Sequence, residues 1–340
     1  MKLLVPLCAA LALSSQTPDE LRFAPAEGLA LTRVWEKVEE TRVQSVQLLV
    51  DGEDRTPAAL RERRPVTTRR DRLVVEDRIG VLNLLWPGQL ERRFVEISRQ
   101  ETTVLPAREG AAEEENKRSA RSPLQGREVV FLWSDEEGRF LVTYRAGSRG
   151  PAKALEGLEE DLDLRGFLPR GPVAAGAEWI IDPRAFRTLL FPGGDLGVEW
   201  DGQERRLEEL YRTTLAGELR GRYLGPTEVD GSVLGRVALE GRLEAGGELE
   251  LGVENLGTSV KTLGRHWNLE VTGELLWDPL AGHLRSASVK AETRTSRVES
   301  DVIEEAAVGD GEDPEKRAIR IEHRLELAGS LAIDVRFESP

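Results

Sequence analysis

The clearest pattern in the chain is a strict alternation of apolar and polar residues between positions 267 and 277. One set is Trp267, Leu269, Val271, Gly273, Leu275 and Trp277, and the intervening set includes Asn268, Glu270, Thr272 and Glu274. Successive side chains of a β-strand point to opposite faces, so the pattern predicts a strand with one buried face. Fully extended, this stretch spans about 36 Å, which is long for a strand of a globular protein.

The same alternation recurs near the C-terminus. Residues 319–327 place Ile319, Ile321, His323, Leu325 and Leu327 on one face. Ala328-Gly329-Ser330 then predicts a turn, and residues 331–337 predict a return strand. Asp230-Gly231 predicts a tight hairpin turn earlier in this half. We therefore expect residues 216–340 to form a C-terminal antiparallel β-meander domain.

The first half predicts a second β domain over residues 20–150. Short apolar stretches occur at 73–79, 81–86 and 90–97, and residues 129–144 predict a hairpin. Between 105 and 122 the sequence is charged and of low complexity, with almost nothing to bury, which predicts a mobile loop.

The two β halves flank a segment with helical signals, residues 151–215. Within it, the stretch 168–183 (LPRGPVAAGAEWIIDP) is punctuated by proline and glycine, and Asp182-Pro183 predicts a helix start. Trp179 is expected to anchor the contact between the halves. The predicted fold is mainly β, with two antiparallel β domains of barrel or half-barrel type joined by a short helical bridge.

Residues 1–13 have the pattern of a secretory signal peptide. Lys2 is followed by an apolar run to Leu13, and Ala10-Leu11-Ala12 resembles a cleavage site, so we expect cleavage after about Ala12. A buried helix or a membrane anchor is the alternative, but the run is too short to span a bilayer. A lipid anchor at Cys8 is disfavoured because Leu7 stands where such sites have a small residue. The prediction is an exported protein, periplasmic or extracellular, without a transmembrane helix.

Composition narrows the classes of partner. Cys8 is the single cysteine, so a chain cleaved after it has neither a disulfide nor a thiolate metal site. The formal net charge is −14, which argues against binding nucleic acid or an anionic membrane surface.

Recognisable catalytic motifs are missing from the sequence. The three histidines have no metal-site spacing, and no HExxH, G-x-S-x-G, P-loop or dinucleotide fingerprint occurs. His323 is the one histidine predicted to face inward, where a hydrogen-bonded core residue is commoner than a catalyst. We therefore predict no catalytic residue, no metal site, no cofactor and no enzymatic activity.

Small residues on the inward faces leave two interpretations open. Gly235, Gly241, Gly273, Ala287 and Ala291 stand among larger neighbours. They either leave room for an apolar ligand in a curved sheet or permit bending and close packing, and the second is favoured. The candidate ligand-binding residues are Trp267, Leu269, Gly273, Trp277 and His323.

The central region resembles a known kind of exported protein. SPLQGREVVFLW, LEEDLDLRGFLP, PVAAGAEWIIDP and FPGGDLG, within 122–197, resemble segments of uncharacterised exported bacterial β-rich proteins. The shared pattern is Leu-Pro, Pro-x-x-x-Gly-x-x-Trp and Pro-Gly-Gly-Asp. That family has no established activity, so the resemblance implies export and architecture alone.

Together these features predict a non-enzymatic envelope or extracellular protein of structural or interaction type. The alternative is a carrier for an apolar, lipid-like ligand held in a curved β-sheet. The expected partner is accordingly either an unknown envelope protein or an apolar ligand.

Overall fold

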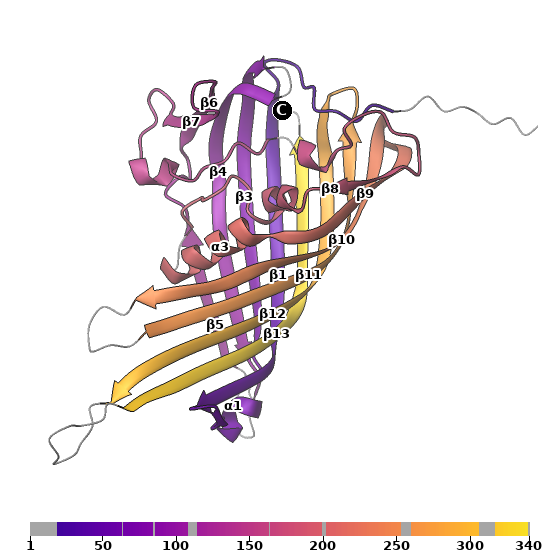
Figure 1. Ribbon diagram of the computed structural model, residues 1–340. Helices are drawn as coiled ribbons and strands as arrows, with labels where there is room; N and C mark the ends of the chain where they lie inside the picture. The colour runs from indigo at the N-terminus through magenta and orange to yellow at the C-terminus, as the bar shows by residue number, and fades with distance from the viewer. Residues whose placement is uncertain are drawn as a thin grey trace, which may run out of the picture.

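The fold is one large, strongly bent antiparallel sheet (Figure 1). The computed structural model describes residues 19–338 apart from 63, 84–85, 108–113, 163, 199–201, 253–259 and 306–316. Its strands are β1 (Ala30–Val50), β2 (Glu53–Asp54), β3 (Val66–Asn83), β4 (Trp86–Leu105), β5 (Glu114–Arg121), β6 (Glu128–Ser134), β7 (Arg139–Tyr144), β8 (Glu178–Ile181), β9 (Ala216–Val229), β10 (Ser232–Gly252), β11 (Val260–Asp278), β12 (His283–Glu305) and β13 (Arg317–Glu338).

Two meanders join at the first and last strands. The order is β7-β6-β4-β3-β1-β13-β12-β11-β10-β9-β8, with β2 paired to β1 and β5 paired to β4. Antiparallel pairing of β1 with β13 runs from Thr32 opposite Glu338 to Val50 opposite Ile321. Among the described strands, β7 and β8 end the path, so the sheet is not closed.

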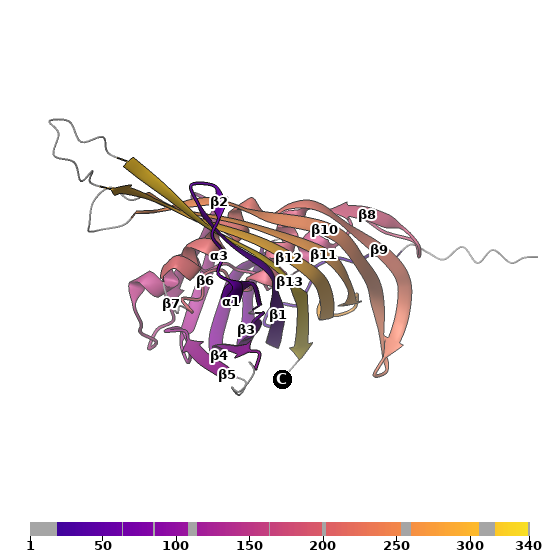
Figure 2. The same cartoon turned by 90° about the horizontal axis from the view of Figure 1, so that it is seen from below.

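The mainly β class is therefore confirmed, and strands β9 to β13 pair in sequence order. Two separate domains are not confirmed, because both halves share one sheet and one core cluster. Adjacent strands of a sheet rotate relative to one another by about 20–25°. The rotation accumulates, so the strands of the first half cross the direction of the last strands (Figures 1 and 2).

The central segment packs against the sheet. It holds the 3₁₀ helices η1 (Ala152–Leu155), η2 (Arg165–Phe167) and η3 (Pro183–Phe186), strand β8, and helices α2 (Arg187–Leu190) and α3 (Gly202–Thr214). Its buried side chains include Phe167, Phe186, Leu189 and Leu190, and they belong to the same core cluster as Trp277 of β11. A bridge between two domains is thus not confirmed, since the segment contributes to the single core.

The predicted helix start at Asp182-Pro183 is confirmed. The Asp182 side chain accepts a hydrogen bond from the backbone N–H of Arg184 at 2.9 Å, and Pro183 occupies the first helical position of η3. A carboxylate at this position satisfies an N–H that has no partner within the helix. The Asp230-Gly231 turn is also confirmed, with φ of 50° and 78°, as a two-residue hairpin turn requires.

The turn predicted at Ala328-Gly329-Ser330 is wrong. These residues lie inside β13, which continues without interruption from Arg317 to Glu338. A Cβ atom on Gly329 would overlap the backbone oxygen of Glu40 on β1. The glycine therefore permits a close approach of two strands, as glycine within a strand commonly does.

The loop predicted between 105 and 122 is wrong for residues 114–121, while 108–113 lie outside the described residues. Residues 114–121 form β5, which pairs with β4 from Ser98 to Leu105. Every β5 side chain except that of Ala120 is exposed. An edge strand needs backbone hydrogen bonds rather than burial, and its charged side chains discourage pairing with another chain.

The short α1 helix (Ala58–Glu62) follows β2, near the far end of β1. The predicted stretch at 73–79 lies within β3 and the stretch at 90–97 lies within β4. Of the stretch at 81–86, residues 81–83 end β3 and Trp86 begins β4, while 84–85 lie outside the described residues. These strands extend through polar stretches because their inward charges are paired, as described below.

Candidate binding surfaces

The predicted ligand-binding residues do not form one site. Trp267, Leu269 and Trp277 are buried on the inward face of β11, with exposed fractions of 6%, 1% and 0%, and Gly273 lies between them on the same strand. His323 is exposed, which corrects the expectation that it faces the interior. It pairs with Leu48 of β1 and Glu299 of β12, in the part of β13 that extends beyond the buried residues.

Another histidine is buried instead. His283 begins β12 and is 5% exposed, and its Nδ1 lies 2.7 Å from the backbone oxygen of Leu284. It follows directly after the turn of residues 279–282. Its contact with the backbone of the next residue indicates a structural role.

The inward glycines mark close packing. A Cβ atom on Gly235 would lie 2.6 Å from Cδ2 of Leu21, and one on Gly273 would lie 2.8 Å from the backbone oxygen of Ser288. A Cβ atom on Gly241 would overlap the backbone of β9. At these positions the space is taken by the chain itself, which favours the packing interpretation over room for an apolar ligand.

Two indole groups on β11 remain without a hydrogen-bond partner among the described residues. These are Nε1 of Trp267 and Nε1 of Trp277, and both are buried. Trp267 packs on Tyr211 of α3, with ring centroids 5.1 Å apart. Burial raises the pKa of Tyr211 to about 12, so this phenol is neutral at physiological pH. The contact fixes α3 against the C-terminal half of the sheet.

A buried ionic cluster, here called the Asp161 cluster, joins the central segment to β1, β3 and β4. Asp161 Oδ1 accepts from Arg33 at 2.8 Å and from Arg92 at 2.9 Å, and Oδ2 accepts from Gly193 N–H at 2.6 Å. Arg92 also donates to both oxygens of Asp77, at 2.6 and 3.0 Å. Burial alone raises the pKa of Asp161, but the two guanidinium groups outweigh it and hold the pKa at about 2.

A second buried network, the Asp71 cluster, holds α3 against the first half of the sheet. Asp71 contacts Lys37 Nζ at 2.9 Å, Arg99 Nε at 2.9 Å and Arg69 Nε at 3.2 Å. Glu208 of α3 contacts Arg69 at 2.6 Å and Arg99 at 2.8 Å. Burial opposes ionisation of Asp71, yet the three cations hold its pKa far below the ordinary value.

Sequence patterns did not reveal these clusters. On β1 the inward positions alternate between apolar and cationic residues, as Leu31, Arg33, Trp35 and Lys37. A charge at every second inward position looks like a solvated face when one strand is considered alone. The sequence did contain one indication of them. On β3 the acidic residues Asp71 and Asp77 occupy the same set of alternate positions as most of its apolar residues.

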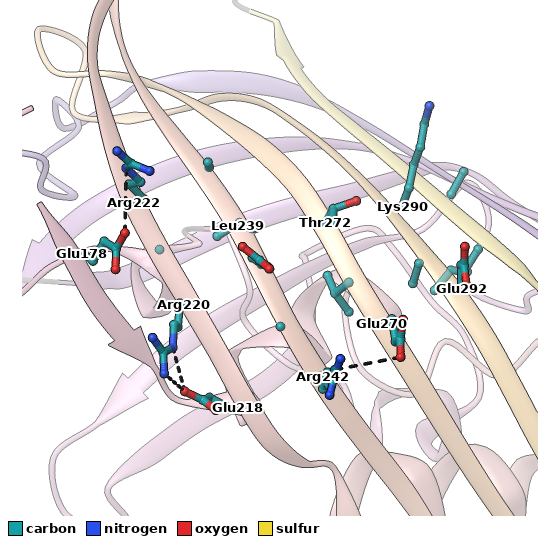
Figure 3. A pocket seen from close by; sticks show the side chains of 18 of the residues that line it. Glu178, Glu218, Arg220, Arg222, Leu239, Arg242, Glu270, Thr272, Lys290 and Glu292 are labelled. Carbon is teal, nitrogen blue, oxygen red and sulfur yellow. Dashed lines mark hydrogen bonds and ion pairs between the residues drawn. The ribbon is translucent and has the colours of Figure 1, made fainter. Parts of the chain in front are cut away.

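The opposite face of the C-terminal half carries a hollow with both charged and apolar lining residues (Figure 3). The hollow encloses about 1240 Å³, and its walls include side chains from β8 to β13. Nine of its twenty lining residues are charged: Glu178, Glu218, Arg220, Arg222, Glu240, Arg242, Glu270, Lys290 and Glu292. We refer to this surface as the outer hollow.

Some of the charged side chains in the outer hollow form ion pairs with one another. Arg242 lies 3.9 Å from Glu270, and Arg220 pairs with Glu218. Glu270 of β11 stands directly opposite Glu292 of β12, and like charges at such positions are destabilising. Among the described residues, Glu292 has no cation within ion-pair distance. The hollow therefore keeps an uncompensated carboxylate that a basic group can approach from solvent.

Comparisons with known proteins add little to this geometry. No protein family matches the sequence, and no curated protein matches it either. Among solved structures, the chain is similar to the secretin domain β-barrel of InvG from the Salmonella SPI-1 injectisome NC-base, at 8% sequence identity and a TM-score of 0.14. That match covers 93% of this chain but 64% of the other, less than two thirds of its length. A similarity this low carries no argument about fold or function.

Helices of membrane-spanning length and hydropathy are not found in the described part of the chain. The described residues also contain no group of three or more His, Cys, Asp or Glu side chains suited to hold a metal ion.

Proposed function

We propose that this chain is an exported, non-enzymatic protein of the cell envelope or extracellular space that binds a polar macromolecular partner through the outer hollow. The main support for this proposal is that the two faces of the sheet differ. The inward face is covered by the chain's own central segment, whose Phe167, Phe186 and Leu189 are fully buried in the core. The outer face keeps a broad hollow open to solvent, and nine of its twenty lining residues are charged.

Export is supported by the signal-like pattern of residues 1–13 and by the lack of cysteine after Cys8. The resemblance of residues 122–197 to exported bacterial β-rich proteins points the same way. Production of the chain with its own leader in a Gram-negative host, followed by mass analysis of the exported form, tests this. The expected mass corresponds to cleavage after about Ala12, and an uncleaved cytoplasmic chain would contradict it.

A non-enzymatic role is supported by the scattered positions of the histidines. His266 and His323 are exposed on different strands, and His283 contacts the backbone oxygen of Leu284. The charged groups that do converge, in the Asp161 and Asp71 clusters, are paired with opposite charges. Pairing and hydrogen bonding of this kind is what allows charged groups to be buried in a folded protein.

The partner surface is tested by site-specific photocrosslinking in cells that make the protein. A crosslinker replacing Thr272, inside the outer hollow, should capture one partner, whereas one replacing exposed Glu136 in the β6–β7 turn should not. Glu292→Lys is the decisive variant, because it relieves the repulsion with Glu270 and so preserves folding. It should abolish capture at Thr272. Equal capture by this variant would exclude the outer hollow as the partner surface.

Native mass spectrometry and solvent extraction of the purified protein separate this proposal from an apolar-ligand carrier. We expect the mass of the unliganded chain and no stoichiometric lipid in the extract. A lipid-like molecule bound in a one-to-one ratio would instead establish the carrier.

A further inference from the structure

The residues before β1 dock on the sheet as an extended peptide. Leu21 is 2% and Phe23 is 6% exposed, Pro25 is buried as well, and the residues between them are exposed. Such an alternation is typical of a strand, yet the segment is outside every strand of the sheet and makes one isolated bridge, between Asp19 and Val173. Folded proteins commonly recognise an extended peptide by binding its alternate side chains in separate pockets.

Backbone hydrogen bonds fix both ends of this segment. Asp19 N–H donates to Val173 O and Val173 N–H donates to Asp19 O, both at 2.9 Å. Near the other end, Ala24 N–H donates to Gly282 O at 2.8 Å. The Tyr223 hydroxyl donates to Asp19 Oδ2 at 2.6 Å. Asp19 is thus bound through its carboxylate as well as through its backbone.

Glycines make room for the segment. A Cβ atom on Gly235 would lie 2.6 Å from Cδ2 of Leu21, so the leucine side chain sits directly on the β10 backbone. A Cβ atom on Gly282, whose φ is +70°, would overlap the backbone of Ala24. Gly282 allows a backbone contact that any side chain would block, whereas a side chain at Gly235 would force Leu21 to shift.

The wall residues come from distant parts of the chain. Val173 precedes β8, Tyr223 lies on β9, Gly235 on β10 and Gly282 in the β11–β12 turn. Arg165 of η2 completes the wall, with its guanidinium carbon 5.4 Å from the centre of the Phe23 ring. Together these five residues form what we name the N-terminal groove.

The segment is joined to the rest of the fold by a short exposed connection. Ala26, Glu27 and Gly28 are exposed, and Gly28 has a φ of +78° in the turn that leads into β1. Apart from this connection, residues 19–25 are held on the sheet by hydrogen bonds and side-chain packing.

We propose that the N-terminal groove is a peptide-binding site whose resident occupant is the chain's own segment 19–25. The groove recognises an extended peptide with an acidic residue, then leucine, phenylalanine and proline at alternate positions. Cleavage of the leader after about Ala12 would leave this segment on the exported chain. The N-terminal groove is a different surface from the outer hollow, so each of the two proposals can be wrong without the other.

Nicking of the folded protein tests the proposal without a refolding step. A protease recognition sequence is inserted between Ala26 and Gly28, the full chain is purified and folded, and the connection is then cut. We expect the N-terminal fragment to remain bound in native mass spectrometry. A fluorescent synthetic peptide of residues 19–25 should then displace it in a saturable manner.

Peptide variants supply the matched controls. A peptide with Leu21→Asp should bind about tenfold or more weakly, because it loses a buried leucine side chain. A peptide with Glu20→Gln should bind like the parent, because that side chain is exposed. On the groove side, Gly235→Val should weaken binding to a similar extent. Gly264→Ala, whose Cβ atom would have its nearest neighbour at 3.7 Å, should leave it unchanged.

Three outcomes would overturn the proposal. Unfolding of the nicked protein when the fragment leaves would show that the segment is an inseparable part of the core. Absence of saturable peptide binding to the nicked protein would exclude a binding site. Equal affinity of the Leu21→Asp peptide would exclude recognition by the leucine pocket.

Discussion

Arg33 and Asp161 form a buried ion pair of 2.8 Å although 128 positions separate them in the sequence. The pair ties β1 to the central segment, and each of the two side chains is 2% exposed. A carboxylate that neutralises two buried guanidinium groups cannot be removed without leaving charge in the core.

Asp161→Asn should therefore destabilise the protein by about 3–5 kcal/mol, the usual loss when one partner of a buried pair is removed. Denaturant unfolding gives the free energy directly. Glu137→Gln breaks the exposed pair with Arg139 and serves as the control, with a change below about 1 kcal/mol. Equal stability of Asp161→Asn and the parent would show that the cluster does not hold the central segment.

Acid should weaken the fold in a defined pH window. The folded pKa of Asp161 is about 2, against an ordinary value of 3.8, and the pKa of Asp71 is also lowered. A lowered pKa contributes stability that is fully present above the unfolded value and is lost as pH falls through the folded value. We expect a nearly constant unfolding free energy from neutral pH to about 5, and a loss of about 2 kcal/mol from Asp161 on going from there to about pH 2.

Urea unfolding at a series of pH values measures this loss. In Asp161→Asn the slope below pH 4 should be shallower, because the titrating group is gone. An identical slope in the two proteins would assign the acid sensitivity to other carboxylates.

Trp179→Ala should loosen the contact between the central segment and β9. The indole Nε1 of Trp179 donates to the backbone oxygen of Phe167 at 3.0 Å, and the ring packs directly on Gly221. Loss of this ring and its hydrogen bond should cost about 2–4 kcal/mol. The neighbouring Ile180 is 76% exposed, so Ile180→Ala is a matched control with little expected effect. Thermal unfolding of the two variants side by side decides whether Trp179 is an anchor.

Gly329→Ala should disrupt the junction of β1 and β13. The added Cβ atom would overlap the backbone oxygen of Glu40, and backbone cannot move aside as a flexible side chain can. We expect a strongly destabilised protein or loss of soluble protein. Gly264→Ala on β11 adds the same atom where its nearest neighbour is 3.7 Å away, and should be tolerated. Soluble yield and denaturant midpoint are the readouts, and normal stability of Gly329→Ala would argue against a continuous β13.

The local features of the fold were readable from the sequence. The face of β11 with Trp267 and Trp277, the Asp182 helix cap and the Asp230-Gly231 turn depend on neighbouring residues alone, and all three are confirmed. Alternation with a period of two specifies which side chains share a face, and short-range hydrogen bonds specify caps and turns.

Tertiary structure decided the long-range relationships. Alternation does not specify which strands pair, so the β1–β13 junction that unites the two halves was out of reach, and Gly329 was taken for a turn. The charges at Arg33, Lys37 and Asp71 signal solvent in a single strand, and become core groups only when neighbouring strands and the central segment neutralise them. The outer hollow likewise arises from the accumulated twist of many strands, which no single segment determines.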